Sequence, residues 1–338
     1  MQKILLFIAS LFYFNFLFSK NEIKSWQGIH ETPLSRLEQQ FAEPPVEFAN
    51  HVIWGWEGKM DKKTICNDLD SIKKKGFRAV IFEAGYKLPF KYLSEEWFKA
   101  IRTGVVEAKK RDMKVWIIDE GKYPSGFAGG KFSQERPDLR MQALVIGDTI
   151  QIKRGEVMTN HKIAPEIISA VAVSTSGAPN RTVEINNGKI SFNAGLDDWK
   201  ILLVKSDFRT AVTRAVNNPN GGKDATNSLC DYLNPVAVQQ FIDWTHKQYK
   251  KYLGKELGTT VLGFRGDEPD YAHLPWTPSI VQTFKDTKGY DPTPYLASFF
   301  TASPTIQEQR VKADYWDVWS SLPPTFSNYK PIGVQPME

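Results

Sequence analysis

Apolar runs and helical spacings alternate along the first part of the chain. Residues 51–56 (HVIWGW), 77–83 (FRAVIFE) and 114–119 (KVWIID) are short apolar runs that predict strands. Between these runs, residues 61–75 and 93–112 place their apolar side chains on one helical face, which predicts two helices. Near-continuous apolar strands that alternate with helices are typical of a parallel sheet covered by helices. We therefore predict an α/β fold.

The alternation stops after residue 140. Residues 141–232 contain short strand-like segments separated by turn signals, so they predict a β-rich insertion after the third strand. The predicted strands are 141–147, 149–153, 169–175, 182–186, 189–193 and 200–205. The α/β pattern resumes in residues 233–330 with a helix over 234–253 and a fourth strand at 259–264. Two further helices are predicted over 277–287 and 305–320.

The first 19 residues have the pattern of a secretory signal peptide. Lys3 gives a positive start, residues 4–18 are mostly apolar, and Ser19 offers a small residue for cleavage. The run is short for a membrane span, and an uncleaved anchor is the alternative. We find no second apolar stretch long enough to cross a bilayer. The sequence therefore predicts a periplasmic or secreted protein without a membrane span in its mature form.

Composition narrows the classes of function. The 338 residues are 41% hydrophobic and 24% charged, which suits a globular chain with a substantial core. The net charge of +5 is spread along the chain without a block of like charges, so neither nucleic acid nor a membrane surface is indicated as a partner. Aromatic residues reach 13%, which suits either sugar stacking or a large core. Cys66 and Cys230 fit no metal-ligand spacing, and whether they pair stays open.

Acidic residues follow the predicted strands. Glu83 ends the second strand, Asp119 and Glu120 end the third, and Asp267 and Glu268 follow the fourth. In parallel α/β folds the carboxyl ends of the strands carry the site, so these acids are expected to converge on one pocket. Such convergence suits two-carboxylate chemistry, in which one carboxyl donates a proton and another attacks or activates water.

The same acids also suit a purely structural role or a metal site. A single acid after a strand is often only a cap or a solvated turn residue. Asp119, Glu120, Asp267 and Glu268 are hard oxygen ligands that would suit Ca²⁺, so calcium is the one cofactor the sequence suggests. The Gly-rich stretch 126–130 lacks the phosphate-loop pattern, and no motif for a serine nucleophile is found.

Aromatic residues near the predicted strand ends are candidates for sugar binding. Trp54 and Trp56 alternate on the first strand, Tyr123 follows the third, and Trp276 follows the fourth. Each could stack on a sugar ring or fill the core. With Glu83, they form the predicted substrate-binding set, whose partner would be a carbohydrate.

Several segments, taken in order, resemble a known enzyme family. They are VIWGWEG, FEAG, the stretch from KYLSEEWF to DEGKYPSGFAGG, the stretch from LCDYLNP to GFRGDEPDY, and LPWTPSIVQTFKDTKGYDPTPYL. Together they are similar to the α-L-rhamnosidase-type glycoside hydrolases of family 106, from about residue 45 to residue 330. The resemblance implies a partial TIM-like (β/α) barrel that carries the insertion after its third strand. It also implies inverting hydrolysis of a terminal deoxysugar or related glycoside, with Ca²⁺ holding sugar hydroxyls and Glu268 as the first choice of catalytic carboxylate.

The resemblance covers about half of such a barrel. It divides the chain into a first half of the barrel (20–140), the insertion (141–232), its continuation (233–330) and an aberrant or truncated tail (331–338). Strands five to eight are missing, and with them a second catalytic carboxylate could be missing. We therefore expect the N-terminal portion of an exported glycosidase acting on plant-type polysaccharides or glycosides. The alternatives are an inactive carbohydrate-binding remnant and a gene fragment.

Overall fold

The computed structural model describes residues 33–42, 50–121, 124–209, 228–267 and 271–322. The chain forms two units, the first ending at Asn50 and the second beginning at His51. Within the first unit the structure describes one helix, α2 (Leu34–Ala42). The second unit carries the elements described below. The predicted signal peptide (1–19) and tail (331–338) lie outside the described residues and stay predictions.

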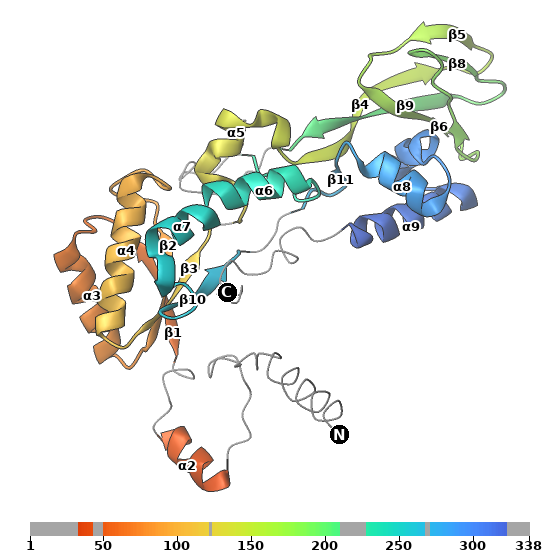
Figure 1. Cartoon of the computed structure of the whole chain (residues 1–338). Coiled ribbons are helices and arrows are strands. Elements are labelled where there is room, and N and C mark those ends of the chain that lie inside the picture. The colour runs from red at the N-terminus through yellow and green to blue at the C-terminus, as the bar shows by residue number, and fades with distance from the viewer. Residues whose placement is uncertain (1–32, 43–49, 122–123, 210–227, 268–270, 323–338) are drawn as a thin grey trace, which may run out of the picture. The chain divides into compact units, whose positions relative to one another are not determined.

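A four-stranded parallel sheet opens the second unit (Figure 1). Its strands are β1 (His51–Trp56), β2 (Ala79–Ala84), β3 (Lys114–Ile118) and β10 (Val261–Arg265). They lie in the order β1-β2-β3-β10, so each strand pairs with the next strand of this sheet along the chain. The parallel α/β architecture predicted from the sequence is confirmed.

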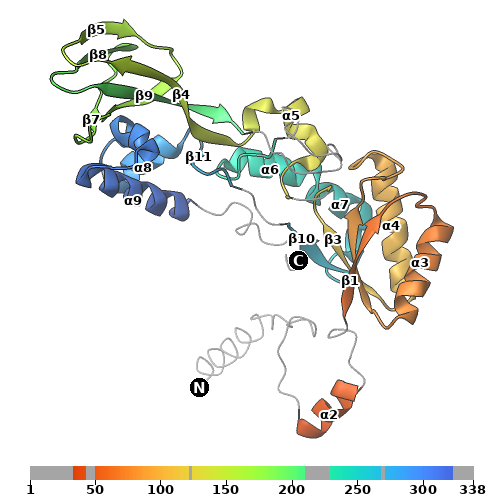
Figure 2. The same ribbon diagram turned by 180° about the vertical axis from the view of Figure 1, so that it is seen from behind.

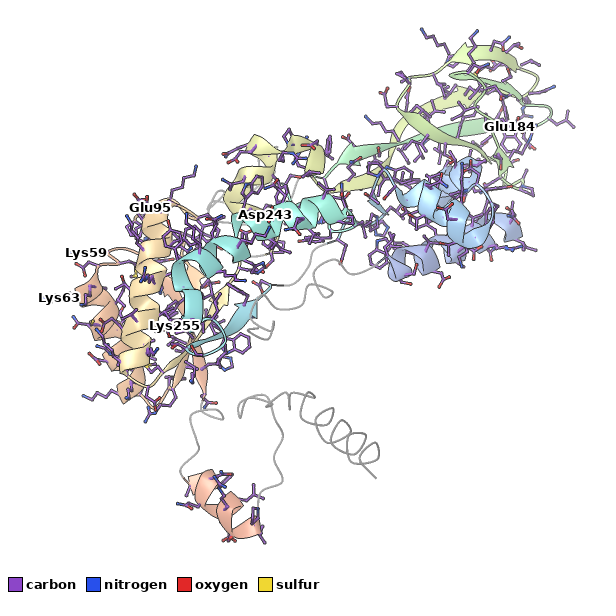
Figure 3. The ribbon with its side chains drawn as sticks, in the orientation of Figure 1. Lys59, Lys63, Glu95, Glu184, Asp243 and Lys255 are labelled. Carbon is purple, nitrogen blue, oxygen red and sulfur yellow. The ribbon has the colours of Figure 1, made fainter. Side chains whose placement is uncertain are left out.

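Helices α3 (Lys62–Lys74), α4 (Glu95–Lys110) and α7 (His246–Leu253) pack beside one another next to this sheet (Figure 1). Asp61, the first residue of the predicted helix 61–75, caps α3, because its carboxylate accepts the backbone N–H of Thr64 at 2.8 Å. Charged side chains such as Lys63 and Glu95 lie on the outer faces of these helices (Figure 3).

Aromatic side chains fill the core between this sheet and its helices. Trp56, Phe82 and Trp97 are buried, with the Trp56 ring centroid 5.0 Å from that of Phe82 and 5.7 Å from that of Trp97. The Trp97 indole N–H donates to the Tyr249 hydroxyl at 2.9 Å. Gly104 of α4 lies so close to these rings that a Cβ there would be 2.9 Å from Phe82. The helix can therefore approach the sheet only with glycine at this position.

The insertion is an antiparallel β structure, as the sequence predicts (Figure 2). One sheet has the order β11-β4-β9-β6-β7, and a separate ribbon pairs β5 with β8. The strands of the insertion are β4 (Gln142–Ile152), β5 (Val157–Lys162), β6 (Ile167–Ser174), β7 (Arg181–Thr182), β8 (Lys189–Asn193) and β9 (Trp199–Phe208). A later strand, β11 (Pro275–Trp276), joins the sheet beside β4. No helix longer than five residues lies within the described part of 141–232.

The remaining helices connect and cover these sheets. Short helices η2 (Ala128–Gly130), α5 (Lys131–Glu135) and η3 (Pro137–Leu139) follow β3, and α6 (Pro235–Trp244) precedes α7, which η4 (Gly254–Glu256) follows. Helices α8 (Ile280–Lys288), η5 (Thr293–Phe300) and α9 (Ile306–Ser321) pack against the sheet of the insertion. Among the described helices, none has the length and apolar character that crossing a membrane requires.

The limits of some strands and helices differ from the sequence-based predictions, and the structure answers one question that the sequence left open. The predicted strands 141–147 and 149–153 form one strand, β4, with an irregularity between Ile146 and Asp148. The predicted helix 234–253 is divided at Thr245, whose backbone ψ is −87°. Cys66 and Cys230 are both free thiols in the structure.

Candidate functional site

The carboxyl ends of the parallel strands bring the predicted acids to one edge of the sheet. Asp119 and Glu120 directly follow β3, and Asp267 comes two residues after β10, the neighbour of β3. Both acids after β3 are buried, with 3% of Asp119 and 1% of Glu120 exposed. Buried carboxyl groups need hydrogen-bond partners, and the partners of these two groups show what each does.

Asp119 joins three parts of the chain. Its backbone N–H donates to the Arg265 carbonyl at 3.2 Å, which continues the pairing of β3 with β10. One side-chain oxygen, Oδ1, accepts the Ser125 hydroxyl at 2.7 Å, and the other, Oδ2, lies 3.2 Å from Nε2 of His246. Asp119 is therefore held from both sides, by its own loop and by the first residue of α7.

Ser125 connects the loop after β3 to the loop after β10. Its backbone N–H donates to the Asp267 carbonyl at 3.1 Å, and its hydroxyl oxygen accepts the Asp267 N–H at 2.8 Å. The Ser125 carbonyl in turn accepts the hydroxyl of Tyr232. These bonds fix the backbone of Asp267, the residue directly before Glu268.

Glu120 is enclosed by the loop that follows it. Its Oε1 accepts the backbone N–H groups of Gly121 at 2.7 Å and Gly129 at 3.0 Å, and its Oε2 accepts those of Ala128 at 2.6 Å and Gly126 at 3.3 Å. Burial raises the pKa of Glu120 to about 7, although the backbone N–H groups favour the charged form and oppose that rise. The geometry indicates that this carboxylate organises the loop.

Glycines allow the loop to wrap around Glu120. Gly126 and Gly129 have φ values of +126° and +62°, a region that favours glycine. A Cβ on Gly126 would also lie 2.8 Å from the Tyr232 ring. The Gly-rich stretch that the sequence shows after β3 is thus explained by a buried carboxylate rather than by a phosphate.

Two site residues escaped the sequence analysis. His246 begins α7 and packs edge-on against Phe264 of β10, with ring centroids 4.5 Å apart. Asp231 is 2% exposed, and burial raises its pKa to about 6 while the Leu233 N–H donates to it at 3.0 Å. Both residues belong to segments that carry the family resemblance, but neither follows a strand. The rule that places a site at the carboxyl ends of parallel strands therefore does not select them.

The aromatic candidates occupy different environments. Trp54 is half-buried beside Trp56 and Phe82, whereas Trp56 is fully buried, as core packing requires. Trp276 is 6% exposed and packs within the core between the insertion sheet and α8 and α9, not beside the acids after β3 and β10. Glu83 is half-buried on β2, next to Gly55 of β1. Tyr123 and Glu268 lie outside the described residues, so their roles stay predictions.

The described residues do not fit a calcium site. Among them, no group of three or more His, Cys, Asp or Glu side chains is arranged to hold a metal ion. All four oxygens of Asp119 and Glu120 already face donors of the protein itself: Ser125, His246 and four backbone N–H groups. Calcium therefore stays a prediction.

The network around Ser125 gives a direct test of how the two loops are joined. We expect Ser125→Ala to destabilise the fold by about 1–3 kcal/mol, because it leaves Oδ1 of the buried Asp119 and the Asp267 N–H each without a partner. Exchange of the Asp267 amide hydrogen should accelerate, as followed by NMR. Ser320→Ala is the matched control, since the Ser320 hydroxyl bonds only a carbonyl of its own helix. Unchanged exchange at Asp267 would show that the loops are held in another way.

Part of the chain is similar to a known enzyme family. Residues 158–314 match the model of glycoside hydrolase family 106, α-L-rhamnosidase. The solved structure of a rhamnosidase from Novosphingobium sp. PP1Y is similar in fold, with a TM-score of 0.57 and 14% identity over 86% of this chain. The family resemblance drawn from the sequence is confirmed over residues 158–314, which are related to the α-L-rhamnosidases of this family.

A curated relative extends the comparison. A protein of Formosa agariphila that carries the name of a β-glucuronidase is 23% identical in an alignment 329 positions long, gaps included, that covers 82% of this chain. The chain spans 28% of the length of that relative and 45% of the length of the Novosphingobium chain.

Proposed function

We propose that this chain is part of an exported α-L-rhamnosidase-like glycoside hydrolase, and that its parallel sheet forms the first half of a (β/α) barrel. The family match over residues 158–314 supports the reaction class. The strand order β1-β2-β3-β10 supports the barrel, because each barrel strand pairs with the next one along the chain. The observation that carries the proposal is the bonding of Asp267 to Ser125, which holds the start of the Glu268 loop beside the acids after β3.

In the proposed reaction, Glu268 acts as the general acid. It donates a proton to the glycosidic oxygen as the bond between that oxygen and the anomeric carbon breaks. A water molecule attacks the anomeric carbon from the opposite face and gives up a proton to a carboxylate base, so the configuration inverts. A terminal deoxysugar such as rhamnose is the proposed substrate, in a plant-type polysaccharide or glycoside.

The other residues of the proposed site have supporting roles in this proposal. Asp119 and Glu120 shape the two loops, because their oxygens are engaged by Ser125, His246 and the loop backbone. Asp267 Oδ1 lies 3.7 Å from the guanidinium of Arg265, so the Asp267 carboxylate faces a positive charge. Trp54 is the aromatic candidate best placed to contact a sugar, since it lies half-buried on β1.

An assay with aryl α-L-rhamnosides tests the proposal. Because the chain spans only part of the length of its relatives, turnover is to be measured both on residues 1–338 and on an enzyme that contains them. Because the four parallel strands are only half of the proposed barrel, we expect residues 1–338 alone to release no aryl group above a Glu268→Gln control. Binding of rhamnosides without turnover in either form would favour a carbohydrate-binding remnant instead.

Export gives a separate prediction. If residues 1–19 are a signal peptide, the protein recovered from the periplasm or the medium begins near Lys20. Mass spectrometry of the N-terminal peptide measures this directly. A protein that keeps Met1 and stays in the cytoplasm would contradict export while leaving the hydrolase proposal intact.

A further inference from the structure

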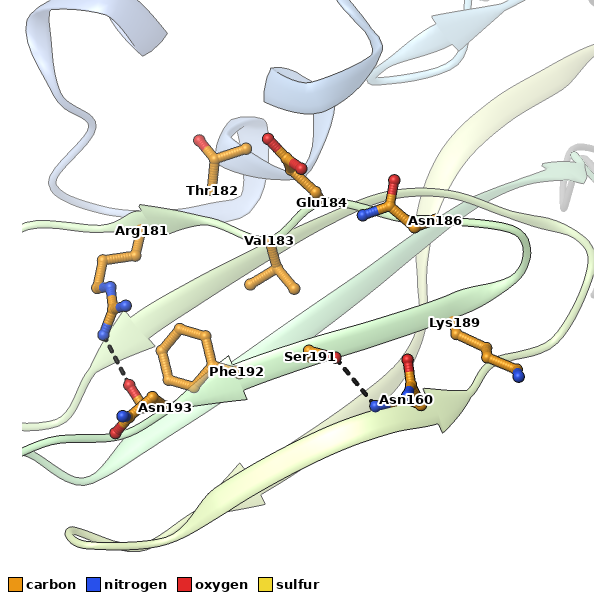
Figure 4. Close-up of a pocket in the computed structure, with 10 residues that line it drawn as sticks. All are labelled: Asn160, Arg181, Thr182, Val183, Glu184, Asn186, Lys189, Ser191, Phe192 and Asn193. Carbon is orange, nitrogen blue, oxygen red and sulfur yellow. Dashed lines mark hydrogen bonds between the residues drawn. The ribbon is translucent and has the colours of Figure 1, made fainter.

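The charged side chains around the cavity of the insertion do not converge on one ligand. This cavity lies between the segment 181–186 and the β5–β8 ribbon (Figure 4). Arg181 is bonded to the Asn193 carbonyl at one end of it, whereas Lys189 lies at the other end (Figure 4). Glu184 points to the opposite side of its own segment (Figure 4). We therefore assign no ligand to this cavity.

The parallel sheet, by contrast, aligns charged side chains on its inner face, the face opposite to α3, α4 and α7. Successive side chains of a strand point to opposite faces. Phe82 of β2 belongs to the core beneath these helices, so Glu83 lies on the inner face. Trp56 of β1 is in the same core, so Gly55, the partner of Glu83 in the pairing, also lies on the inner face. A Cβ on Gly55 would be 3.5 Å from Oε2 of Glu83, which agrees with this placement.

Arg265 lies on the inner face at the end of β10. Its neighbour Phe264 packs against Tyr249 of α7, with ring centroids 5.3 Å apart. The Arg265 side chain, one residue along, therefore points away from the helices. On β3, Ile117 belongs to the core beneath the helices, so Ile118 lies on the inner face, opposite Arg265 in the pairing.

Glu83, Ile118 and Arg265 thus form one line across the carboxyl ends of three neighbouring strands. Phe82 pairs with Ile117, which sets Glu83 level with Ile118, and Ile118 pairs with Arg265. Two strand spacings, about 10 Å, separate Glu83 from Arg265. A carboxylate accepts hydrogen bonds and a guanidinium donates them, so the two groups can hold hydroxyl groups at opposite sides of one sugar ring.

The Arg265 guanidinium has donors available for a ligand. Its side chain is 42% exposed, and among the described residues the acid that faces it is Asp267, whose Oδ1 lies 3.7 Å from Nη2. This distance is longer than a hydrogen bond, and a guanidinium has five N–H donors. Arg265 also directly precedes the loop that contains Glu268, so a sugar bound by Arg265 lies at the start of the proposed catalytic loop.

We propose that Arg265 is a specificity residue of the hydrolase site, and that its guanidinium donates to hydroxyl groups of the terminal sugar while Glu83 accepts from hydroxyl groups on the other side of the ring. The inference rests on the proposed function, because it places the terminal sugar at the carboxyl ends of these strands. It adds the residues that recognise this sugar.

Steady-state kinetics of the enzyme that contains residues 1–338 tests the assignment. The substrates are an aryl α-L-rhamnoside and its 2-deoxy, 3-deoxy and 4-deoxy analogues. We expect Arg265→Gln to lower kcat/KM on the rhamnoside at least about tenfold, chiefly through KM, because it removes a charged donor to the sugar. On an analogue that lacks the hydroxyl bound by Arg265, the same variant should lose less than about threefold, because that bond is already absent.

Control variants separate recognition from structure. Arg265→Lys keeps the charge but loses the planar fork, so we expect a smaller loss than in Arg265→Gln. Arg102→Gln is the matched control, since Arg102 is an exposed arginine of α4, on the other side of the sheet, and kcat/KM should be unchanged. Melting curves of all variants show that they are folded.

The pattern across the four substrates decides the outcome. If Arg265 acts only through Asp267 and its loop, Arg265→Gln loses the same factor on all four substrates, and the assignment is wrong. An unchanged kcat/KM on the rhamnoside would also overturn it. Glu83→Gln should lose its effect on a different analogue from Arg265→Gln, and the same analogue for both would contradict a sugar held between them. If the unchanged enzyme hydrolyses none of the four substrates, the hydrolase proposal itself fails, and the role of Arg265 fails with it.

Discussion

Replacing Glu268 by glutamine in the active enzyme is expected to lower kcat by about 10²–10⁴-fold, the range for loss of a general acid–base group. Glutamine keeps the size of the side chain but has no carboxyl proton to give to the leaving oxygen. The loss should be largest on alkyl glycosides, whose leaving groups need protonation. It should shrink on aryl glycosides with acidic leaving groups, which depart with little help.

The matched control is Glu95→Gln, which makes the same chemical change on the exposed face of α4 (Figure 3). Glu95 forms an ion pair only with Lys99 one turn along, so its loss should leave kcat unchanged and cost about 0.5 kcal/mol or less. Steady-state rates on a pair of substrates, one alkyl and one aryl, provide the measurement. Full activity of Glu268→Gln on the alkyl substrate would remove Glu268 from the mechanism.

The parallel half of the fold was predictable because its signals are local. The strands at 51–56 and 114–118 are short runs with clear limits, and Asp61 stands where a helix cap must stand. The observed helix α4 lies within the predicted range 93–112, since Ser94 caps its start and the apolar face ends near Lys110. Such features depend on residues a few positions apart, which the sequence shows directly.

The insertion was predictable in kind but less in detail. The strand β5 (VMTNHK) was missed because its residues are polar and mostly exposed, so no apolar alternation marks it. The division of 234–253 into α6 and α7 was missed because Thr245 is an ordinary helical residue in sequence. Its hydroxyl bonds the Phe241 carbonyl at 2.6 Å while its backbone leaves the helical region, and only the packed structure determines that choice.

At the site, the sequence located the acids after β3 but could not assign their partners. The bonds that decide the role of Asp119 come from Ser125 nearby and from His246, which is distant along the chain. The same limit applies to Trp56, whose spacing suited either a sugar platform or the core until its burial was known. Long-range contacts of this kind leave no periodic signal in one sequence.

The second large effect is expected at Glu120. Glu120→Ala should lower the free energy of unfolding by at least about 3 kcal/mol, because it leaves four backbone N–H groups of the loop 121–129 without their acceptor. Chemical denaturation at pH 7 measures the loss. Glu135→Ala is the matched control, since Glu135 forms an exposed ion pair with Lys131 and should cost about 0.5 kcal/mol or less.

The pH dependence of stability tests the electrostatic part of this argument. Folding raises the pKa of Glu120 from 4.5 to about 7, so between these values the folded chain holds a proton more often than the unfolded chain does. The stability that this group contributes is therefore greatest below pH 4.5, falls as pH rises towards 7, and is constant above that, a change on the order of 3 kcal/mol. Burial raises the pKa of Asp231 to about 6, so Asp231 also lowers the stability as pH rises. This loss is the same in the unchanged chain and in a variant at Glu120.

The variant Glu120→Gln separates the contribution of Glu120 to this pH dependence from that of Asp231. The amide keeps one acceptor oxygen in the loop but does not titrate, so the decline between pH 4.5 and 7 should shrink by the share that belongs to Glu120. Urea unfolding of the unchanged chain and of Glu120→Gln at intervals across this range gives the difference directly. If both proteins lose the same stability over the range, the four backbone N–H groups hold Glu120 ionised throughout, and the carboxylate stabilises the loop as a fixed charge whose pKa stays low.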